Sequence, residues 1–243
     1  MIFNLRITYR CNRRCSYCNI ANFYGDGDLE TILDYLDFLL KHDVEVGLYG
    51  GEALMYPHID QILNKYPNVL NIITNGDFLE DERIELFKKI VISVHDDFDN
   101  SYFEKLAKYP KIEKYLIVYT NETYTHIMNM YNQLKPSFQK KIRLIPYKNK
   151  KKNNLFLDDE AKSKIKILNP AEYEKYNIDE EECLKNKQIS NIDFVKNTIT
   201  YCCVSHYREP LSKELVLAAI NNQYKEFDFE TQLLDCKMCT KKW

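Results

Sequence analysis

Three cysteines near the start of the chain have the spacing of metal-cluster ligands. Cys11, Cys15 and Cys18 follow the pattern Cys-x3-Cys-x2-Cys, directly after a strand-like apolar run at 2–8. Three thiolates on one loop can bind three corners of a cubane iron–sulfur cluster, which leaves the fourth iron open to a small molecule. The alternative is a zinc site, but zinc prefers four protein ligands, and no fourth Cys or His lies nearby in the sequence. The spacing therefore favours an iron–sulfur cluster with one open corner.

Short polar motifs end the next strand-like runs. Gly50-Gly51-Glu52 follows the run at 45–49. Two glycines let the backbone approach a ligand closely, and a carboxylate beside them can accept hydrogen bonds from an ammonium group. Thr74-Asn75-Gly76 ends the run at 69–74, where a plain β-to-α turn explains it equally well. Because these motifs follow successive runs, we expect them to lie at one edge of a parallel sheet.

The cysteine pattern and the Gly-Gly-Glu motif together resemble the signature of the radical SAM superfamily. That resemblance implies a [4Fe–4S] cluster whose open iron binds the amino and carboxylate groups of S-adenosylmethionine (SAM). The residues to which it gives SAM contacts are Tyr17 near the adenine, Gly50, Gly51 and Glu52 at the methionine amino group, Asn75 near the ribose, and Ser93 at the methionyl or ribose part. His95, two residues after Ser93, is a lone histidine of a kind that is more often structural than catalytic.

A second set of cysteines lies in the last third of the chain. It comprises Cys183, Cys202, Cys203, Cys236 and Cys239. A hairpin is expected at 189–203, with Lys196-Asn197 at its turn, because Asn tolerates positive φ. Four soft thiolates can hold either an iron–sulfur cluster or a structural zinc ion. Since the first motif already indicates cluster chemistry, we favour iron–sulfur here as well.

This arrangement resembles the Twitch domain, the short form of the SPASM extension, which carries an auxiliary [4Fe–4S] cluster. The ligands implied by the resemblance are Cys183, Cys202, Cys236 and Cys239. Cys203 is then spare, although Cys202 and Cys203 could exchange roles. The sequence lacks the Gly that is typical of the turn in Twitch hairpins.

Composition and charge place the chain among ordinary globular proteins. Its 243 residues include 34 Lys and Arg against 36 Asp and Glu, which gives a net charge of −2. This balance offers no case for binding nucleic acid or a membrane surface. We see no signal-peptide pattern and no apolar run near the roughly 20 residues of a membrane span, so we expect a cytoplasmic protein. In that reducing compartment, 8 cysteines argue for metal or redox use rather than disulfides.

Alternating strand and helix patterns predict an α/β fold. Such alternation implies parallel strands with right-handed crossovers, and six units make a partial (β/α)6 barrel. The expected strands are 2–8, 45–49, 69–74, 90–94, 115–119 and 142–146, and the expected helices are 28–42, 57–65, 80–89, 100–108 and 122–134. A further helix is expected at 211–224. We expect a radical SAM core at 1–147, a bridging segment at 148–182, and a small Twitch-like hairpin-plus-helix domain at 183–243.

The resemblance implies a radical SAM oxidoreductase. One electron from the reduced cluster would cleave SAM to methionine and a 5′-deoxyadenosyl radical, which abstracts a hydrogen atom from the substrate. The auxiliary cluster would accept a second electron and so complete a two-electron oxidation. Expected partners are a small-molecule or peptide substrate and an electron donor of the flavodoxin or ferredoxin type.

Three interpretations of the overall function follow. In length and cysteine spacing the chain is similar to the 2-deoxy-scyllo-inosamine dehydrogenases, which favours dehydrogenation of a small alcohol or sugar-like molecule. The alternative is cross-linking, epimerisation or thioether formation in a ribosomally made peptide. Enzymes of that kind commonly carry an amino-terminal recognition domain, whereas the first strand is expected at residue 2 here. Outside the enzymes, the alternative is a zinc-stabilised α/β binding protein.

Overall fold

The computed structural model describes residues 2–15, 18, 20–95, 97–119, 123–146, 189–200 and 209–221. The strands are β1 (Ile2–Thr8), β2 (Glu45–Gly50), β3 (Asn71–Thr74), β4 (Lys89–Val94), β5 (Ile112–Tyr119), β6 (Ile142–Pro146), β7 (Ile189–Asp193), β8 (Thr198–Thr200) and β9 (Glu209–Pro210). The α-helices are α1 (Leu29–Lys41), α2 (Ile59–Lys65), α3 (Asn100–Leu106), α4 (Tyr124–Asn132), α5 (Pro136–Gln139) and α9 (Lys213–Ile220). Two 3-10 helices, η1 (Ala53–Met55) and η2 (Glu82–Leu86), complete the described elements.

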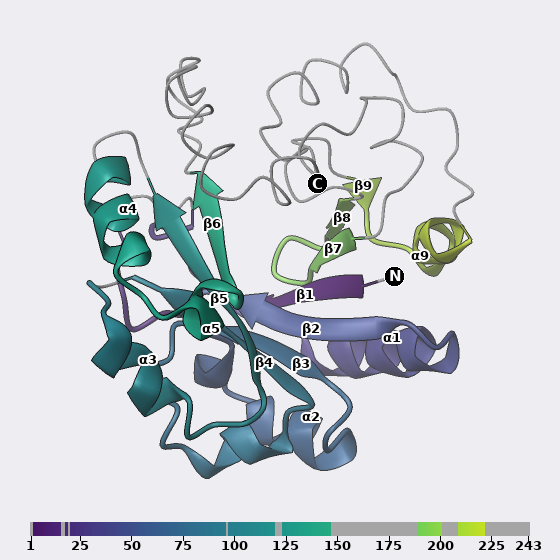
Figure 1. Cartoon of the computed structure of the whole chain (residues 1–243). Coiled ribbons are helices and arrows are strands. Elements are labelled where there is room, and N and C mark those ends of the chain that lie inside the picture. Colours follow the sequence, from purple (N-terminus) through teal and green to yellow (C-terminus); the bar gives the residue numbers. More distant parts are fainter. Residues whose placement is uncertain are drawn as a thin grey trace, which may run out of the picture.

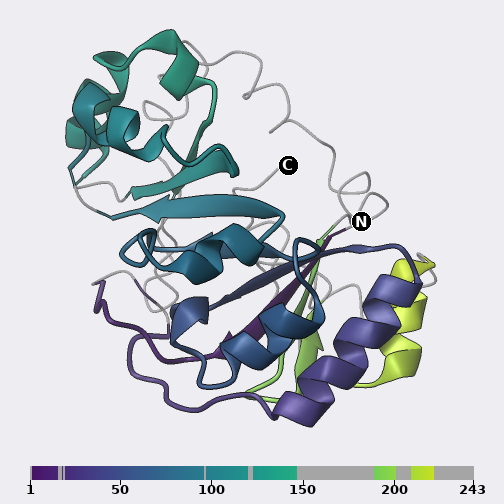
Figure 2. The ribbon, with the colours of Figure 1, turned by 90° about the horizontal axis from the view of Figure 1, so that it is seen from below.

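The nine strands of the described residues join one sheet in the order β6-β5-β4-β3-β2-β1-β7-β8-β9 (Figure 1). Strands β1 to β7 run parallel, and β8 and β9 are antiparallel to their neighbours. The helices that connect β1 to β4 lie across one face of the sheet (Figure 2). The predicted α/β partial barrel is therefore confirmed.

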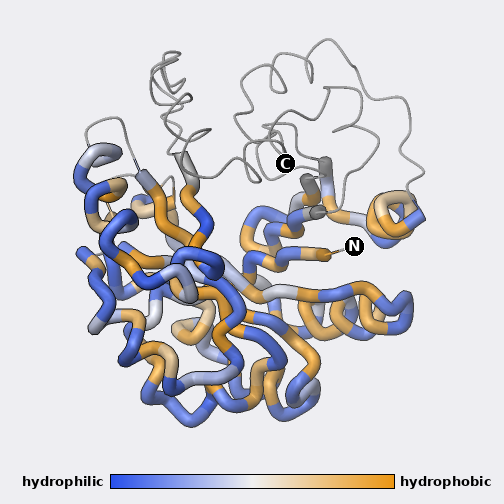
Figure 3. Tube along the Cα trace, in the orientation of Figure 1, coloured by the Kyte–Doolittle hydropathy of each residue, from blue (hydrophilic) through white to orange (hydrophobic). Residues whose placement is uncertain are grey.

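Strand β1 shows how the sequence pattern creates the core. Phe3, Leu5 and Ile7 are fully buried, and the residues between them face the opposite side of the sheet. Helix α1 buries Ile32, Leu36 and Leu39 in the same core. Burial of each such side chain contributes about 1.5–3 kcal/mol. Figure 3 shows the resulting apolar positions along the strands and on one side of α1.

Helix α1 begins and ends close to the predicted bounds of 28–42. Asp28 caps its first turn, since its carboxylate accepts from the Thr31 backbone N–H at 2.9 Å. The expected helix at 80–89 is wrong: that segment holds only the short η2, and β4 begins at Lys89. Phe87 explains the difference, because it is fully buried and its backbone is already extended, which ends the helical turn.

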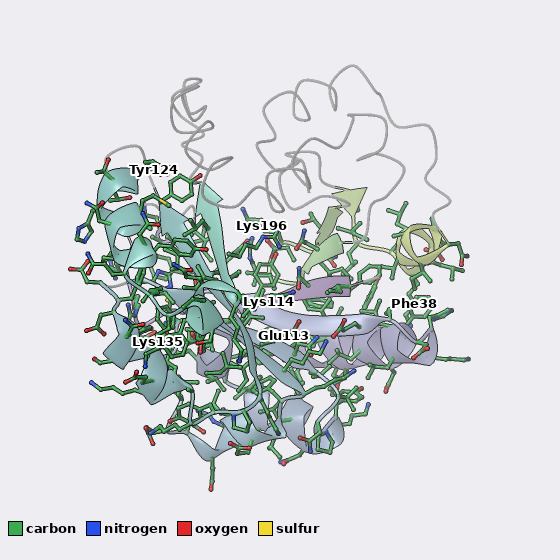
Figure 4. The ribbon with its side chains drawn as sticks, viewed as in Figure 1. Phe38, Glu113, Lys114, Tyr124, Lys135 and Lys196 are labelled. Carbon is green, nitrogen blue, oxygen red and sulfur yellow. The ribbon has the colours of Figure 1, made fainter. Side chains whose placement is uncertain are left out.

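Strand β7 continues the sheet beyond β1. It runs parallel to β1, with Ile189 opposite Ile2 and Asp193 opposite Arg6. In the following turn, Asn197 has φ 52°, as the sequence predicted. Lys196, labelled in Figure 4, lies in this turn with its Nζ 4.1 Å from the centroid of the Phe23 ring.

Helix α9 lies beside α1 (Figures 1 and 2). Ser212 caps it by accepting from the Leu215 backbone N–H at 3.3 Å. The Lys213 ammonium reaches the Asp34 carboxylate of α1 at 2.6 Å. The described carboxy-terminal elements therefore pack on the amino-terminal part of the chain.

The boundaries expected at 147/148 and 182/183 stay predictions. Cys183, Cys202, Cys203, Cys236 and Cys239 all lie outside the described residues. Within the described part, none of the helices has the length and apolar character that a membrane span requires.

Candidate functional site

The predicted SAM-site residues that the structure describes lie at the carboxyl edge of the parallel sheet. The cysteine loop follows β1, the Gly-Gly-Glu motif spans the end of β2, and Thr74-Asn75-Gly76 spans the end of β3. Ser93 is a half-buried residue near the end of β4, and His95 follows that strand. Ligands of parallel α/β sheets bind at this edge. Tyr17 lies outside the described residues.

The Gly-Gly-Glu motif is attached to the residues that lead into the first cysteine. The backbone N–H of Gly51 donates to the Thr8 carbonyl at 2.9 Å, and that of Glu52 donates to the Arg10 carbonyl at 2.7 Å. A Cβ atom on Gly50 would overlap the Thr8 carbonyl, and one on Gly51 would overlap the Arg10 carbonyl. The glycines thus allow the chain to approach itself, which brings Glu52 next to Cys11.

The Glu52 side chain is fully buried and links the ends of β2 and β3. Its Oε2 accepts from the Thr74 hydroxyl at 2.9 Å and from the Asn75 backbone N–H at 2.9 Å, and its Oε1 accepts from the Leu54 N–H at 3.2 Å. Burial raises the pKa of the Glu52 carboxyl, and these three hydrogen bonds act in the opposite direction. Among the described residues Oε1 has a single donor, so the carboxylate retains acceptor capacity for an ammonium group.

The three cysteines of the loop are not joined in disulfides. Cys11 is exposed, and Cys15 and Cys18 are half-buried. Burial of the Cys11 sulfur raises the pKa of its thiol, and the nearby Glu52 charge raises it further, whereas the Arg13 N–H and the Asn75 side chain lower it. These interactions place Cys11 beside Glu52 and Asn75, so the structure brings together three of the predicted residues.

A group of hydrogen bonds that the sequence analysis did not predict holds the segment between Cys11 and Cys15. The Asp77 carboxylate accepts from Asn12 Nδ2 at 2.7 Å and from Arg13 Nε at 2.7 Å, and it also pairs with Arg13 Nη2. Asn75 joins them, since its Nδ2 donates to Asn12 Oδ1 at 2.8 Å and its Oδ1 accepts from the Asp77 N–H at 3.0 Å. We call Asn12, Arg13, Asn75 and Asp77 the loop clamp. An aspartate directly after Thr-Asn-Gly was the available signal, but its partners are more than 60 residues away.

His95 contacts the second cysteine of the loop. Its Nδ1 lies 3.4 Å from the Cys15 sulfur. The end of β4 therefore also reaches the cysteine loop, as β2 and β3 do.

The donor set fits an iron–sulfur cluster. Within the part of the chain that the structure describes, no three His, Cys, Asp or Glu side chains are arranged to hold one metal ion. A cubane cluster does not need its ligands around one ion, because each thiolate binds a separate iron atom. Three soft thiol donors on one loop, next to a buried carboxylate, are a suitable ligand set for such a cluster.

Comparisons with known proteins agree with this geometry. The sequence model of the radical SAM superfamily matches residues 5–140, which is more than half of the chain. No curated protein matches. Among solved structures, anSMEcpe with bound AdoMet and Cp18Cys peptide has a TM-score of 0.66 at 17% identity, over 98% of this chain and 85% of that chain. SuiB of Streptococcus suis bound to S-adenosylmethionine has a TM-score of 0.58 at 17% identity, over 93% of this chain and 65% of that chain.

BtrN in complex with AdoMet and 2-DOIA is also similar, at 15% identity over 99% of this chain and 87% of that chain. Its TM-score of 0.43 is too low to support an argument. At these identities, the likeness to anSMEcpe and SuiB establishes a shared fold. The family match itself covers Cys11, Cys15, Cys18, Glu52 and Asn75. The chain therefore belongs to the radical SAM superfamily of enzymes.

Proposed function

We propose that this protein is a radical SAM oxidoreductase whose SAM-binding [4Fe–4S] cluster is held by Cys11, Cys15 and Cys18. The observation that carries the proposal is the meeting of Cys11, Glu52 and Asn75 at the carboxyl edge of the sheet. A cysteine ligand and an acceptor for an ammonium group thereby lie side by side. SAM requires both, since its amino acid end binds at the open iron.

The residues of this chain then have distinct tasks. Glu52 accepts from the ammonium group of SAM, while Thr74 and the Asn75 backbone hold the carboxylate in place. Gly50 and Gly51 keep that carboxylate close to the cysteine loop. When bound, the cluster and SAM together supply a 5′-deoxyadenosyl radical that removes a hydrogen atom from the substrate. Tyr17, Ser93 and the Asn75 side chain are assigned to the adenosyl and methionyl parts.

The proposed reaction is dehydrogenation of a small alcohol or sugar-like substrate. We assign an auxiliary [4Fe–4S] cluster to Cys183, Cys202, Cys236 and Cys239, where it would accept the second electron of the oxidation. The electron that cleaves SAM comes from a donor of the flavodoxin or ferredoxin type, and the substrate loses its own first electron with the abstracted hydrogen atom. A peptide substrate is the second candidate, and it is favoured by the fold match to anSMEcpe, a structure that contains a bound peptide.

Anaerobic reconstitution tests the cluster assignments. The wild-type protein should contain about eight iron atoms per chain, four for each cluster, and should form 5′-deoxyadenosine from SAM under reduction. A variant with Cys11, Cys15 and Cys18 changed to alanine should keep about four iron atoms and form no 5′-deoxyadenosine. Cys203→Ala is the matched control and should retain all of the iron. Turnover by the triple variant would contradict the proposal.

The substrate class requires a separate experiment. Aminocyclitols and peptides that carry deuterium at the candidate C–H positions are incubated with SAM and reductant. Deuterium in 5′-deoxyadenosine identifies the substrate, and formation of a ketone from the alcohol identifies dehydrogenation. Label transfer from a peptide alone would favour the second candidate.

A further inference from the structure

His95 lies where the end of β4 meets the cysteine loop. Its ring is half-buried, and Nδ1 is 3.4 Å from the Cys15 sulfur, within the range of a hydrogen bond to sulfur. The contact joins residues 80 positions apart in the sequence, so it is created by the parallel arrangement of β1 and β4. The preceding residue, Val94, is buried and is the last residue of β4.

The chemistry of Cys15 determines the direction of this hydrogen bond. A protonated thiol can donate to an imidazole nitrogen or accept from it. A thiolate bound to iron has no hydrogen, so its sulfur can only accept. With Cys15 as a cluster ligand, Nδ1 of His95 must therefore carry the hydrogen and donate it.

His95 also lies near Asp77 of the loop clamp. Charge on its ring contributes to lowering the pKa of Asp77, so the two side chains are within electrostatic reach of each other. Asp77 is itself fixed by the loop clamp, through Asn12 and Arg13. His95 therefore lies near both the Cys15 sulfur and the loop clamp.

We infer that His95 is a positioning residue that donates a hydrogen bond from Nδ1 to the Cys15 thiolate and makes the SAM-binding cluster easier to reduce. The inference rests on the proposed function, because it requires Cys15 to be a cluster ligand. Reduction adds one electron, and the added negative charge is spread partly over the thiolate sulfurs. A donor to such a sulfur stabilises the reduced state more than the oxidised state, and hydrogen bonds to the sulfurs are among the factors that set cluster potentials.

Two substitutions separate this role from simple packing. The amide nitrogen of asparagine can occupy the position of Nδ1, so His95→Asn keeps the donor, whereas His95→Ala removes it. An exposed histidine of α4 supplies the control: His126 contacts Asp97 at 2.9 Å, so His126→Ala should change nothing at the cluster.

The test is an anaerobic redox titration with dithionite, followed by EPR. The signal of the SAM-binding cluster is identified by its change when SAM is added. For His95→Ala we expect the equilibrium constant for reduction to fall about tenfold, which for a one-electron couple is a shift of about 59 mV to more negative potential. His95→Asn should stay within about twofold of the wild type. Unchanged potential in a fully loaded His95→Ala, or an equal shift in both variants, would overturn the inference.

A second measurement covers a His95→Ala protein that fails to assemble the cluster. Wild-type protein labelled with ¹⁵N-histidine should show a ¹⁵N hyperfine coupling to the reduced SAM-binding cluster, and His95→Asn with the same label should lose it. No such coupling in the wild type would overturn the inference while leaving the proposed function intact. A wild-type protein that assembles no cluster would instead overturn the proposed function, and the inference with it.

Discussion

At the scale of single residues, the Glu52 carboxylate has a structural role and a proposed role in binding SAM. It links the ends of β2 and β3 through three hydrogen bonds, and it is the proposed acceptor for SAM. In Glu52→Gln, one buried N–H or O–H group would face an amide NH2 instead of an oxygen. We expect the free energy of unfolding to fall by about 1–3 kcal/mol even without SAM.

Denaturant unfolding of the metal-free protein measures this change. Glu85→Gln is the control, because Glu85 is exposed and its ion pair with Lys111 is 3.7 Å long. That control should change stability by less than about 0.5 kcal/mol. Equal stability of Glu52→Gln and the wild type would contradict the described hydrogen bonds.

Gly51 gives a second prediction at the same scale. In Gly51→Ala, the new Cβ would overlap the Arg10 carbonyl, so the end of β2 must move away from the cysteine loop. We expect a loss of about 1–3 kcal/mol in stability and less iron per chain after reconstitution. Gly47→Ala in β2 is the control, because among the described residues its Cβ would meet the Asn4 side-chain oxygen, at 2.9 Å, and no backbone atom. Equal iron content in both variants would count against the proposed link.

The raised pKa of Tyr56 predicts how the free energy of unfolding changes at alkaline pH. Burial of its ring raises the pKa of Tyr56 to about 12, above the usual value of 10.0. Since the folded-state pKa is the higher one, the contribution of Tyr56 is complete below pH 10 and is lost as pH rises toward about 12. Tyr56→Phe should remove that part of the alkaline loss, measured by denaturant unfolding between pH 9 and pH 11, and identical pH profiles would contradict it.

Much of the site could be predicted at the residue scale, because its motifs are local in sequence. Cysteine spacing indicated the loop, and Gly-Gly-Glu indicated the proposed acceptor. The partners of these residues could not be predicted. The contacts of Thr74 with Glu52 and of His95 with Cys15 depend on which strand ends become neighbours. The packing of the whole sheet determines those neighbours.

At the scale of elements, the loop after β3 holds the loop after β1. Asp77 provides this link, through charge-assisted hydrogen bonds to Asn12 and Arg13. We expect Asp77→Ala to loosen the cysteine loop and to speed release of iron to a chelator at least severalfold, with little change in secondary structure.

Asp81→Ala is a matched control for Asp77→Ala. Asp81 also binds an arginine, Arg83, with two carboxylate oxygens, but it caps η2 and does not contact the cysteine loop. The Asp81→Ala variant should release iron at the same rate as the wild type. If both variants release iron at the same rate, the loop clamp does not hold the cluster.

Elements with strong periodicity were predictable, and short ones were not. The apolar spacing indicated α1 to within one residue at each end. Helix α5, with only four residues, leaves no periodic pattern, and it was not predicted. At 80–89 the sequence pattern favours a helix, but Phe87 is buried with an extended backbone. Tertiary packing therefore leaves only the short η2.

At the scale of the whole molecule, β7 connects the carboxy-terminal part to the first strand. Asp193 of β7 pairs with Arg6 at 3.2 Å and accepts from the Tyr9 hydroxyl at 2.6 Å. The sequence predicted the hairpin but not its neighbour. A parallel pairing between distant segments leaves no local signal, because its register depends on long-range contacts alone.

The backbone pairing of β7 with β1 has a consequence for any shortened form of the protein. Cutting the chain after residue 147 would turn β1 from an interior strand into a bare edge, with its peptide groups open to another molecule. Such a fragment should self-associate, whereas a chain ending at residue 221 keeps β1 covered and should stay monomeric. Light scattering of the two metal-free fragments would decide, and a stable monomer of residues 1–147 would show that this edge tolerates exposure.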